Sequence, residues 1–200
     1  MHLYSERKAY YMIGRNRELI ESICQSYALP ASCLKAILMM ELQDIRPSDY
    51  LADALVSFNW LRYSLFRCFV LDRHTRHPLR KFDSSTGYGQ IFSQVAIEAI
   101  LFAQRMDIPL YLGISGELFP FNPDDLRRIW RRLRRDRVFN LSCAALNLLH
   151  SAFQMTGETD FNRLSEDGKK MTFSRYNGNA QQISPYGEQA YRYYLEFEGC

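Results

Sequence analysis

A glutamate on the apolar face of a helix is the first candidate for chemistry in this sequence. Leu34, Ile37, Leu38 and Leu42 recur at helical spacing, and Glu41 falls on the same stripe. Because a buried carboxylate is costly, a carboxyl group on a packing face is expected to have a raised pKa and to stay protonated. A general acid requires such a group. The alternative is that Glu41 lies at the edge of the stripe, where it reaches water or pairs with one of the 25 Lys and Arg residues.

A glycine-rich segment farther along the chain is a second candidate site. Residues 82–92 carry Gly87 and Gly89 on either side of Tyr88, which predicts a tight, irregular backbone that a ligand can approach closely. An ordinary glycine turn is the alternative for this segment. Asp83 precedes the glycines, where it is either a second functional carboxylate or a residue that caps the turn through the serines that follow it.

The overall composition restricts the possible classes of function. A chain of 200 residues with 47% hydrophobic content supports one substantial core. Its net charge of +3 does not by itself indicate a nucleic-acid binder. The five cysteines are scattered and odd in number, so neither a zinc site nor a disulfide framework is expected. The residues indicate no metal and no other cofactor.

Histidine spacing gives little support for a metal site, and hydropathy gives none for a membrane-spanning or secreted chain. His74 and His77 have a spacing that suits a metal, but they lie in a basic segment with a proline, and a solvated loop is expected there. No stretch approaches the length of a transmembrane helix, and the first residues lack the apolar region of a secretory signal. The expectation is therefore a chain with no membrane span and no visible export signal.

Helical periodicity runs through most of the chain, and no convincing alternating strand is present. Helices are expected at residues 15–27, after Pro30, and at residues 49–71, 94–104, 123–137, 140–154 and 186–197. The apolar stripe from Leu51 to Phe69 is interpreted as core. Residues 157–170 are expected to form a polar connection, and residues 173–179 a compact turn. The prediction is an all-α fold in which residues 1–200 form one domain.

One of the expected helices has a strongly basic face. Asn122 and Pro123 mark its start, followed by two acidic residues at the positive end of the helix dipole. Arginines then occupy the outward positions 127, 128, 131, 132, 134, 135 and 137. Such a face suits an anionic polymer or a membrane, although a solvated charged face is the ordinary explanation.

Three stretches, taken in their order along the chain, resemble motifs of the lysozyme-like superfamily that contains lytic transglycosylases and goose-type lysozymes. The segment from Leu29 to Glu41 resembles the catalytic helix. The run Gly87-Tyr88-Gly89-Gln90-Ile91 is similar to the glycine-rich substrate loop, and Tyr176-Asn177-Gly178 is similar to the Tyr-Asn-Ala/Gly motif. The resemblance covers roughly residues 29–194, which implies a lysozyme-like single globular domain.

The resemblance implies a bacterial cell-wall enzyme that cuts the β-1,4 bond between N-acetylmuramic acid and N-acetylglucosamine in the glycan strands of peptidoglycan. Glu41 would be the acid that protonates the leaving glycosidic oxygen. The substrate loop with Gly87, Tyr88 and Gln90 would bind sugar. Tyr176 and Asn177 would position the substrate or Glu41.

A second carboxylate decides the outcome of such a reaction. Asp83 has a spacing similar to that of the supporting aspartate in goose-type lysozymes, and it would be the candidate catalytic base for hydrolysis. Without a competent base, the N-acetyl group of the substrate assists the reaction and the product is a 1,6-anhydro sugar. Both outcomes stay open.

The sequence departs from the superfamily pattern in three places. Leu42 stands where a serine usually follows the catalytic glutamate, and the usual Gly-Leu-Met-Gln run is shortened to Gly89-Gln90. Residues 48–81 form an expected helical insertion after the catalytic helix. This insertion would cover the substrate groove or provide a surface for a partner.

Alternatives from other classes stay open as well. A lysozyme-like module that has lost activity would bind glycan or have a structural role. A basic helical binder of nucleic acid would use residues 127–137, but the order of the three motifs argues against it. For an active enzyme, delivery by a phage or by a secretion apparatus would explain how a chain without a visible signal reaches the cell wall.

Overall fold

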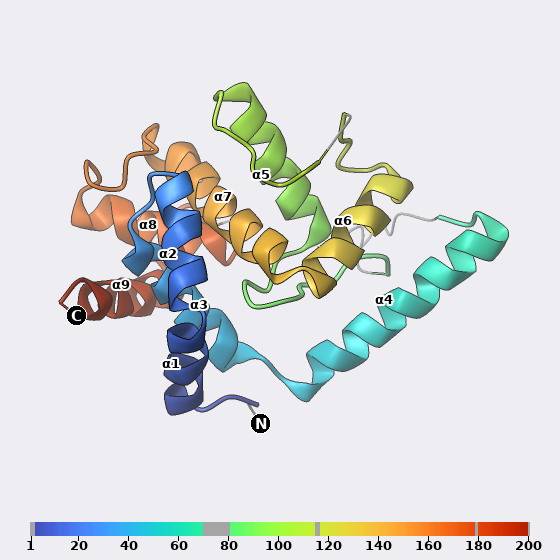
Figure 1. The fold of residues 1–200 in the computed structure, drawn as a ribbon, viewed down its shortest axis with the longest axis horizontal. Helices are drawn as coiled ribbons and strands as arrows, with labels where there is room; N and C mark the ends of the chain where they lie inside the picture. Colours follow the sequence, from blue (N-terminus) through green and yellow to red (C-terminus); the bar gives the residue numbers. More distant parts are fainter. Residues whose placement is uncertain (1–2, 70–80, 115–116, 179, 200) are drawn as a thin grey trace.

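The computed structural model describes residues 3–69, 81–114, 117–178 and 180–199, and in these ranges the chain is all-α (Figure 1). The described residues form the helices α1 (Glu6–Arg15), α2 (Arg17–Ser26), α3 (Ala31–Asp44), α4 (Pro47–Phe66), α5 (Ser93–Arg105), α6 (Pro123–Arg135), α7 (Arg137–Thr156), α8 (Glu166–Tyr176) and α9 (Pro185–Glu198). The predicted all-α class is therefore confirmed for the described part of the chain.

Two helices, α3 and α7, form the centre of the helical body. Helix α3 packs against α1, α2 and α9, while α7 packs against α5, α6 and α8. Leu34, Ile37 and Leu38 of α3 are fully or almost fully buried. On α7, Ala144 and Ala145 have no exposed surface, and small side chains of this kind let neighbouring helices approach closely. The stripe predicted for α3 is thus buried, and Cys33, Ala36 and Met39 outside the stripe are buried as well, so α3 is a central helix with core on most of its sides.

Side-chain caps fix several helix starts. The side chain of Asn122 accepts hydrogen bonds from the backbone amides of Asp124 and Asp125 at the start of α6. Asp136 accepts one from the amide of Phe139 at the start of α7. These contacts satisfy amide groups that have no partner inside a helix, so the sharp starts of α6 and α7 follow from single residues.

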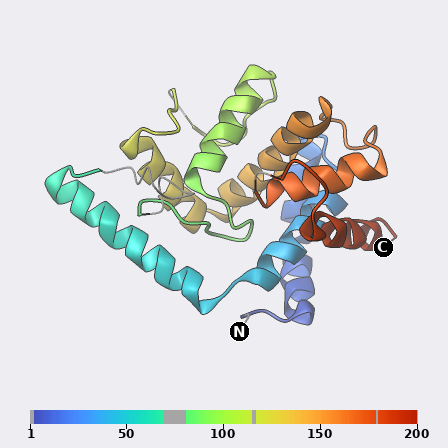
Figure 2. The ribbon, with the colours of Figure 1, turned by 180° about the vertical axis from the view of Figure 1, so that it is seen from behind.

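Helix α4 stands apart from the helical body and runs along its edge (Figures 1 and 2). Its inner face carries Val56, Trp60 and Tyr63, which are buried. The Trp60 ring lies 5.0 Å from the ring of Phe82, measured between centroids, in the segment that precedes α5. An aromatic contact, rather than close packing of helix against helix, therefore holds this side of α4.

The outer face of α4 corrects the sequence prediction. The stripe that its spacing predicts to be core is largely exposed, with exposed fractions of 55–67% for Leu51, Leu55, Phe58, Leu61 and Leu65. Helix α4 has apolar residues on two faces, and the face with Trp60 is the one that turns inward. The expected helical insertion, residues 48–81, includes all of α4 except its first residue, Pro47. Residues 70–80 of the insertion, including His74 and His77, lie outside the described residues.

Residues 166–176 give a second correction. The polar connection and compact turn expected at residues 157–179 are wrong over α8, which is a regular helix. Its start is capped by Ser165, whose hydroxyl accepts a hydrogen bond from the amide of Gly168. The buried residues of α8 include Thr172, Phe173 and Ser174, so the helix packs mostly through small or weakly polar side chains that give no apolar periodicity.

Asp53 attaches α4 to the segment before α5. Its carboxylate accepts hydrogen bonds from the hydroxyls of Ser84, at 2.6 Å, and Thr86, at 3.0 Å. The guanidinium of Arg134 lies 3.6 Å from the same carboxylate. Asp53 is buried on the inner face of α4, so these partners compensate for the cost of burying its charge.

Replacing Asp53 by asparagine is expected to lower the free energy of unfolding by about 1–2 kcal/mol, because one acceptor oxygen becomes an amide that faces donor groups. Hydrogen exchange followed by mass spectrometry should show faster exchange across α4, with little change in α3. Asp124→Asn is the matched control, since Asp124 contacts Arg67 in an exposed pair at 3.6 Å. Equal exchange of α4 in both variants would contradict the role given to Asp53.

None of the helices in the described ranges combines the length and the apolar character that a membrane crossing requires.

Candidate functional site

Glu41 lies near the end of α3 with 9% of its surface exposed. The hydroxyl of Tyr186, on α9, donates a hydrogen bond of 2.5 Å to the Oε1 atom of Glu41. Burial raises the pKa of Glu41 to about 8, while the hydrogen bond from Tyr186 lowers it to a smaller extent and the charge of Asp44 raises it. The carboxyl group is therefore protonated at neutral pH, as its place on the apolar stripe predicts.

Removing the hydroxyl of Tyr186 tests its contact with Glu41. We expect Tyr186→Phe to lower the free energy of unfolding by about 1 kcal/mol, because one buried hydrogen bond is lost. The pKa of Glu41 is expected to rise further, since this hydrogen bond opposes the effect of burial. Urea unfolding at pH 7 measures the first effect. Tyr11→Phe is the control, as Tyr11 is 62% exposed. If both variants have the same stability, the hydrogen bond to Glu41 contributes nothing measurable.

Tyr176 connects the surroundings of Glu41 to the glycine loop, which we define as residues 82–92. The Tyr176 hydroxyl, at the end of α8, donates a hydrogen bond of 2.9 Å to the carbonyl oxygen of Gly89. Burial and the nearby Glu41 raise the pKa of Tyr176 well above its ordinary value. Tyr176 therefore stays a neutral donor to the glycine loop, close enough to Glu41 to feel its charge.

Asn140 fixes the other side of the glycine loop. Its side chain, on α7, accepts a hydrogen bond from the amide of Gly89 and donates one to the carbonyl oxygen of Thr86, each at 2.9 Å. Gly87 lies against this side chain and has a φ angle of +75°. A Cβ atom at Gly87 would be 2.2 Å from the Asn140 amide nitrogen. Only glycine fits at position 87, because any larger residue would clash with the Asn140 side chain.

The glycine loop forms a narrow hairpin turn. An isolated antiparallel bridge joins Thr86 and Ile91, and Gln90 has a φ angle of +44°. The Gln90 side chain donates to the carbonyl oxygen of Gly87 at 2.8 Å and accepts from the hydroxyl of Ser85 at 3.3 Å. Both ends of the Gln90 amide group therefore have partners within the loop.

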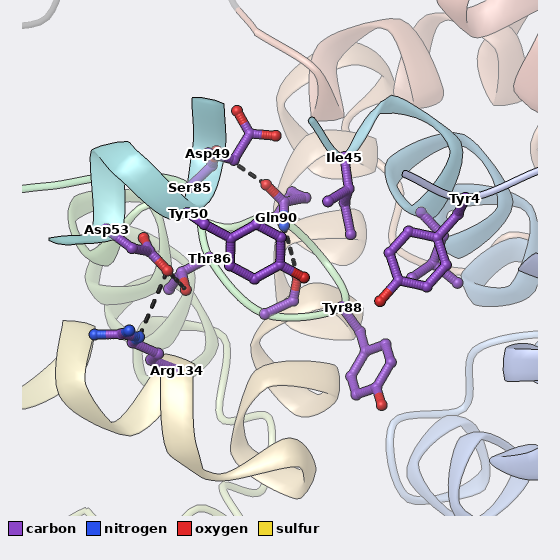
Figure 3. A pocket seen from close by; sticks show the side chains of 12 residues that line it. Tyr4, Ile45, Asp49, Tyr50, Asp53, Ser85, Thr86, Tyr88, Gln90 and Arg134 are labelled. Atoms are coloured by element: carbon purple, nitrogen blue, oxygen red, sulfur yellow. Dashed lines mark hydrogen bonds and ion pairs between the residues drawn. The ribbon is translucent and has the colours of Figure 1, made fainter. Parts of the chain in front are cut away.

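A pocket of about 300 Å³ opens between the glycine loop and α4 (Figure 3). The side chains around it are mostly polar or aromatic, from the segment before α1, the end of α3, α4, the glycine loop and α6. They belong to Tyr4, Leu42, Ile45, Asp49, Tyr50, Asp53, Ser85, Thr86, Gly87, Tyr88, Gln90 and Arg134. Rings next to hydroxyl, amide and carboxylate groups suit a ligand that has both apolar faces and many hydroxyls.

The predicted site residues are only partly brought together. Gly87, Tyr88 and Gln90 line the pocket. Glu41 is not among its described lining residues, although the next residue, Leu42, is. Asn177 is exposed at the end of α8. The site therefore has two parts, the pocket and the group formed by Glu41, Tyr176 and Tyr186, and the glycine loop connects them.

Asp83 has a capping role at α5. Its carboxylate accepts hydrogen bonds from the amides of Ser93, at 2.8 Å, and Gln94, at 3.0 Å. Burial raises the pKa of Asp83 to about 6, and these backbone hydrogen bonds lower it by less. Asp83 is 4% exposed. Of the two roles open from the sequence, capping is the one its contacts support, and the helix capped is α5.

Tyr186, Asn140 and Asp53 are site residues that the sequence analysis missed. Each acts through a contact with a residue far away in the chain, such as the 145 positions between Glu41 and Tyr186. Asn140 and Asp53 carried a weak signal, because each is a polar residue on the apolar stripe of a helix, as Glu41 is. Tyr186 carried none, since tyrosines are frequent throughout α9.

The basic face of α6 is partly neutralised by acidic residues. Arg128 pairs with Asp125 at 2.8 Å, and Arg132 pairs with Asp136 at 3.2 Å. Arg134 contacts Asp53 on α4. These pairs support the interpretation of α6 as a solvated helix that also attaches α4.

Comparisons with protein-family models, with curated proteins and with solved structures found no match to this chain. A functional assignment therefore rests on the geometry of the site together with the resemblance of the three sequence motifs.

Proposed function

We propose that this chain cleaves the glycan strands of peptidoglycan at the β-1,4 bond between N-acetylmuramic acid and N-acetylglucosamine, with Glu41 as the general acid. The observation that carries the proposal is the buried carboxyl of Glu41, whose pKa of about 8 keeps it protonated at neutral pH. The resemblance of three ordered motifs to lysozyme-like enzymes gives the substrate class, and the lysozyme-like fold is part of the proposal.

The pocket and the residues around Glu41 have separate roles in this proposal. The rings of Tyr4, Tyr50 and Tyr88 offer flat apolar faces for sugar rings, and the pocket also has carboxylate and guanidinium groups for hydroxyls and amides (Figure 3). Gln90 shapes the turn of the glycine loop through its contacts to Gly87 and Ser85. Tyr176 and Tyr186 hold the loop and the acid, respectively.

The first step is a proton transfer from Glu41 to the leaving glycosidic oxygen, which leaves Glu41 as a carboxylate. The carboxylates of this region already have partners. Asp83, within the loop, caps α5, and Asp53, in the pocket lining, accepts from two hydroxyls. Asp49, which also lines the pocket, accepts from the backbone amide of Arg46. We therefore favour assistance by the N-acetyl group of the substrate. As the glycosidic bond breaks, the carbonyl oxygen of the N-acetyl group bonds to the anomeric carbon. The O6 oxygen then displaces this carbonyl oxygen from the anomeric carbon while the Glu41 carboxylate takes the O6 proton, which restores the N-acetyl group and gives a 1,6-anhydro product.

A second candidate function is a lysozyme-like module that binds glycan without cleaving it. The observation in its favour is that Glu41 is outside the described lining of the pocket. Under this alternative, the pocket binds sugar, and the neutral Glu41 is a structural group. The two functions differ in whether the bound strand is cut.

Digestion of purified peptidoglycan separates the two functions. We expect the wild-type chain to release muropeptides with anhydro ends, identified by mass spectrometry, and Glu41→Gln to reduce release by about a thousandfold. Glu18→Gln, on the exposed side of α2, is the matched control and should remain active. Reducing ends would show hydrolysis, and Asp83, the candidate catalytic base, would then be the next residue to replace. Binding without release by a folded wild-type chain would favour the inactive module.

A further inference from the structure

The outer face of α4 is an extended apolar surface. Its exposed apolar side chains are Tyr50, Leu51, Leu55, Phe58, Leu61, Leu65 and Phe66, each with 55–72% of its surface exposed. Between residues 50 and 66, all of which the structure describes, Arg62 is the only exposed charged residue. With roughly 100 Å² for each of these side chains, the face presents about 700 Å², which exceeds the apolar patches of a typical monomer.

The sequence of this face is symmetric about Phe58. Leu55 and Leu61 lie three residues before and after Phe58, and Leu51 and Leu65 lie seven residues before and after it. Tyr50 and Phe66 extend the same symmetry by one residue at each end. A two-fold axis through Phe58 would therefore place Leu51 against Leu65 of a second copy, and Leu55 against Leu61. A two-fold interface requires this self-complementarity.

The helix dipoles favour the same arrangement. In an antiparallel pair the two dipoles oppose each other, which is the favourable orientation for neighbouring helices. The charged residues at the ends of α4 lie away from this interface. Asp49 and Arg67, nine residues before and after Phe58, fall on the opposite side of the helix, where Asp49 accepts a hydrogen bond from the amide of Arg46 and Arg67 lies over the Tyr63 ring.

We infer that this chain forms a two-fold homodimer in which α4 of each copy pairs antiparallel with α4 of the other across Phe58. The area agrees with this inference, since stable interfaces bury about 800 Å² per partner and the face of α4 supplies most of that. The position of α4 at the edge of the body leaves its outer side open to a second helix (Figures 1 and 2).

A second copy fits this face better than a membrane surface does. A helix that lies on a membrane typically carries many Lys and Arg residues beside its apolar face. Helix α4 has only Arg62 in that position, and its other side is occupied by Trp60 and Tyr63 against Phe82 and Phe69. Tyr50 also lines the pocket, so the dimer would bring the second copy close to the pocket entrance.

Sedimentation velocity of the full chain tests this inference directly. At about 50 µM we expect twice the chain mass of 23.5 kDa. Leu61→Arg should weaken the dimer by more than about tenfold in dissociation constant. Leu195→Arg, at a site on α9 that is 52% exposed compared with 55% for Leu61, should leave it unchanged. Circular dichroism verifies that both variants are folded. A wild-type chain that stays monomeric would overturn the inference, whether or not it binds vesicles of phosphatidylglycerol.

Cysteine substitutions test the antiparallel arrangement, in a chain where the exposed Cys68 and the last residue, Cys200, are first replaced by serine. With a short bismaleimide, Phe58→Cys should cross-link to itself across the axis. Leu51→Cys should cross-link only when it is mixed with Leu65→Cys. Cross-linking of Leu51→Cys to itself would indicate a parallel pair and would contradict the inference. None of these outcomes depends on whether the chain cleaves peptidoglycan.

Discussion

Glu41→Gln is expected to be more stable than the wild-type chain at alkaline pH by roughly 3 kcal/mol or more, although it should be inactive. The ordinary pKa of the glutamate side chain is 4.5, and burial raises the pKa of Glu41 to about 8. Between these values the unfolded chain loses the proton and the folded chain keeps it. The stability that comes from a neutral Glu41 is thus complete below pH 4.5 and is lost as pH rises to about 8.

The difference between the two chains is the quantity to measure, because Asp83 and the other titrating groups are common to both. Urea unfolding of wild type and Glu41→Gln from pH 4 to pH 9 should give nearly equal stability at pH 4. The advantage of the variant should grow steadily and level off above pH 8. Glu18→Gln, which changes an exposed carboxyl on α2, should follow the wild type throughout. A difference between wild type and Glu41→Gln that does not vary with pH would contradict a buried neutral Glu41.

Gly87→Ala is expected to be the most destabilising small substitution in the glycine loop, at about 4 kcal/mol. The new Cβ atom would be 2.2 Å from the Asn140 amide nitrogen and 2.9 Å from the carbonyl oxygen of Leu133. Asn140 is 1% exposed and holds both Thr86 and Gly89. Moving it away therefore breaks two buried hydrogen bonds, in addition to the strain of a positive φ angle at alanine.

Gly113→Ala separates the two parts of this effect. Gly113 also has a positive φ angle, +56°, but a Cβ atom there meets nothing within 4 Å. We expect this control to cost about 1 kcal/mol, which is the conformational part alone. Thermal unfolding of both variants, followed by circular dichroism, gives the comparison. If the two substitutions have equal effects, Asn140 does not clamp the glycine loop in the way its contacts indicate.

The residues with a clear local pattern were predictable from the sequence. The stripe of α3 has helical spacing, so the burial of Leu38 followed from the sequence alone. For Glu41 the sequence left two places open, the core and the edge of the stripe, and the structure buries it. The start of α6 was equally predictable, because Asn122 carries its capping signal in the residue itself. The stripe of α3 and the cap of α6 both depend on residues within one or two helical turns of each other.

The errors came from residues whose contacts are distant in the chain. Helix α4 has two apolar faces, and only the contacts of Trp60 with Phe82, and of Asp53 with Ser84 and Thr86, decide which one turns inward. Helix α8 lacks an apolar stripe and is held by α7 and α9. The contact of Tyr186 with Glu41 depends in the same way on how α9 packs against α3.

The pKa of Glu41 is the measurement that tests the central claim most directly. The side-chain carboxyl carbon of each glutamate gives a resonance in a chain labelled with ¹³C, and Glu41→Gln identifies the signal of Glu41 by its loss. Titration from pH 3 to pH 10 should move this signal with a midpoint near 8, well above the ordinary value of 4.5. A midpoint below 5 would show that Glu41 is an ordinary carboxylate at neutral pH, which would contradict its proposed role as the acid.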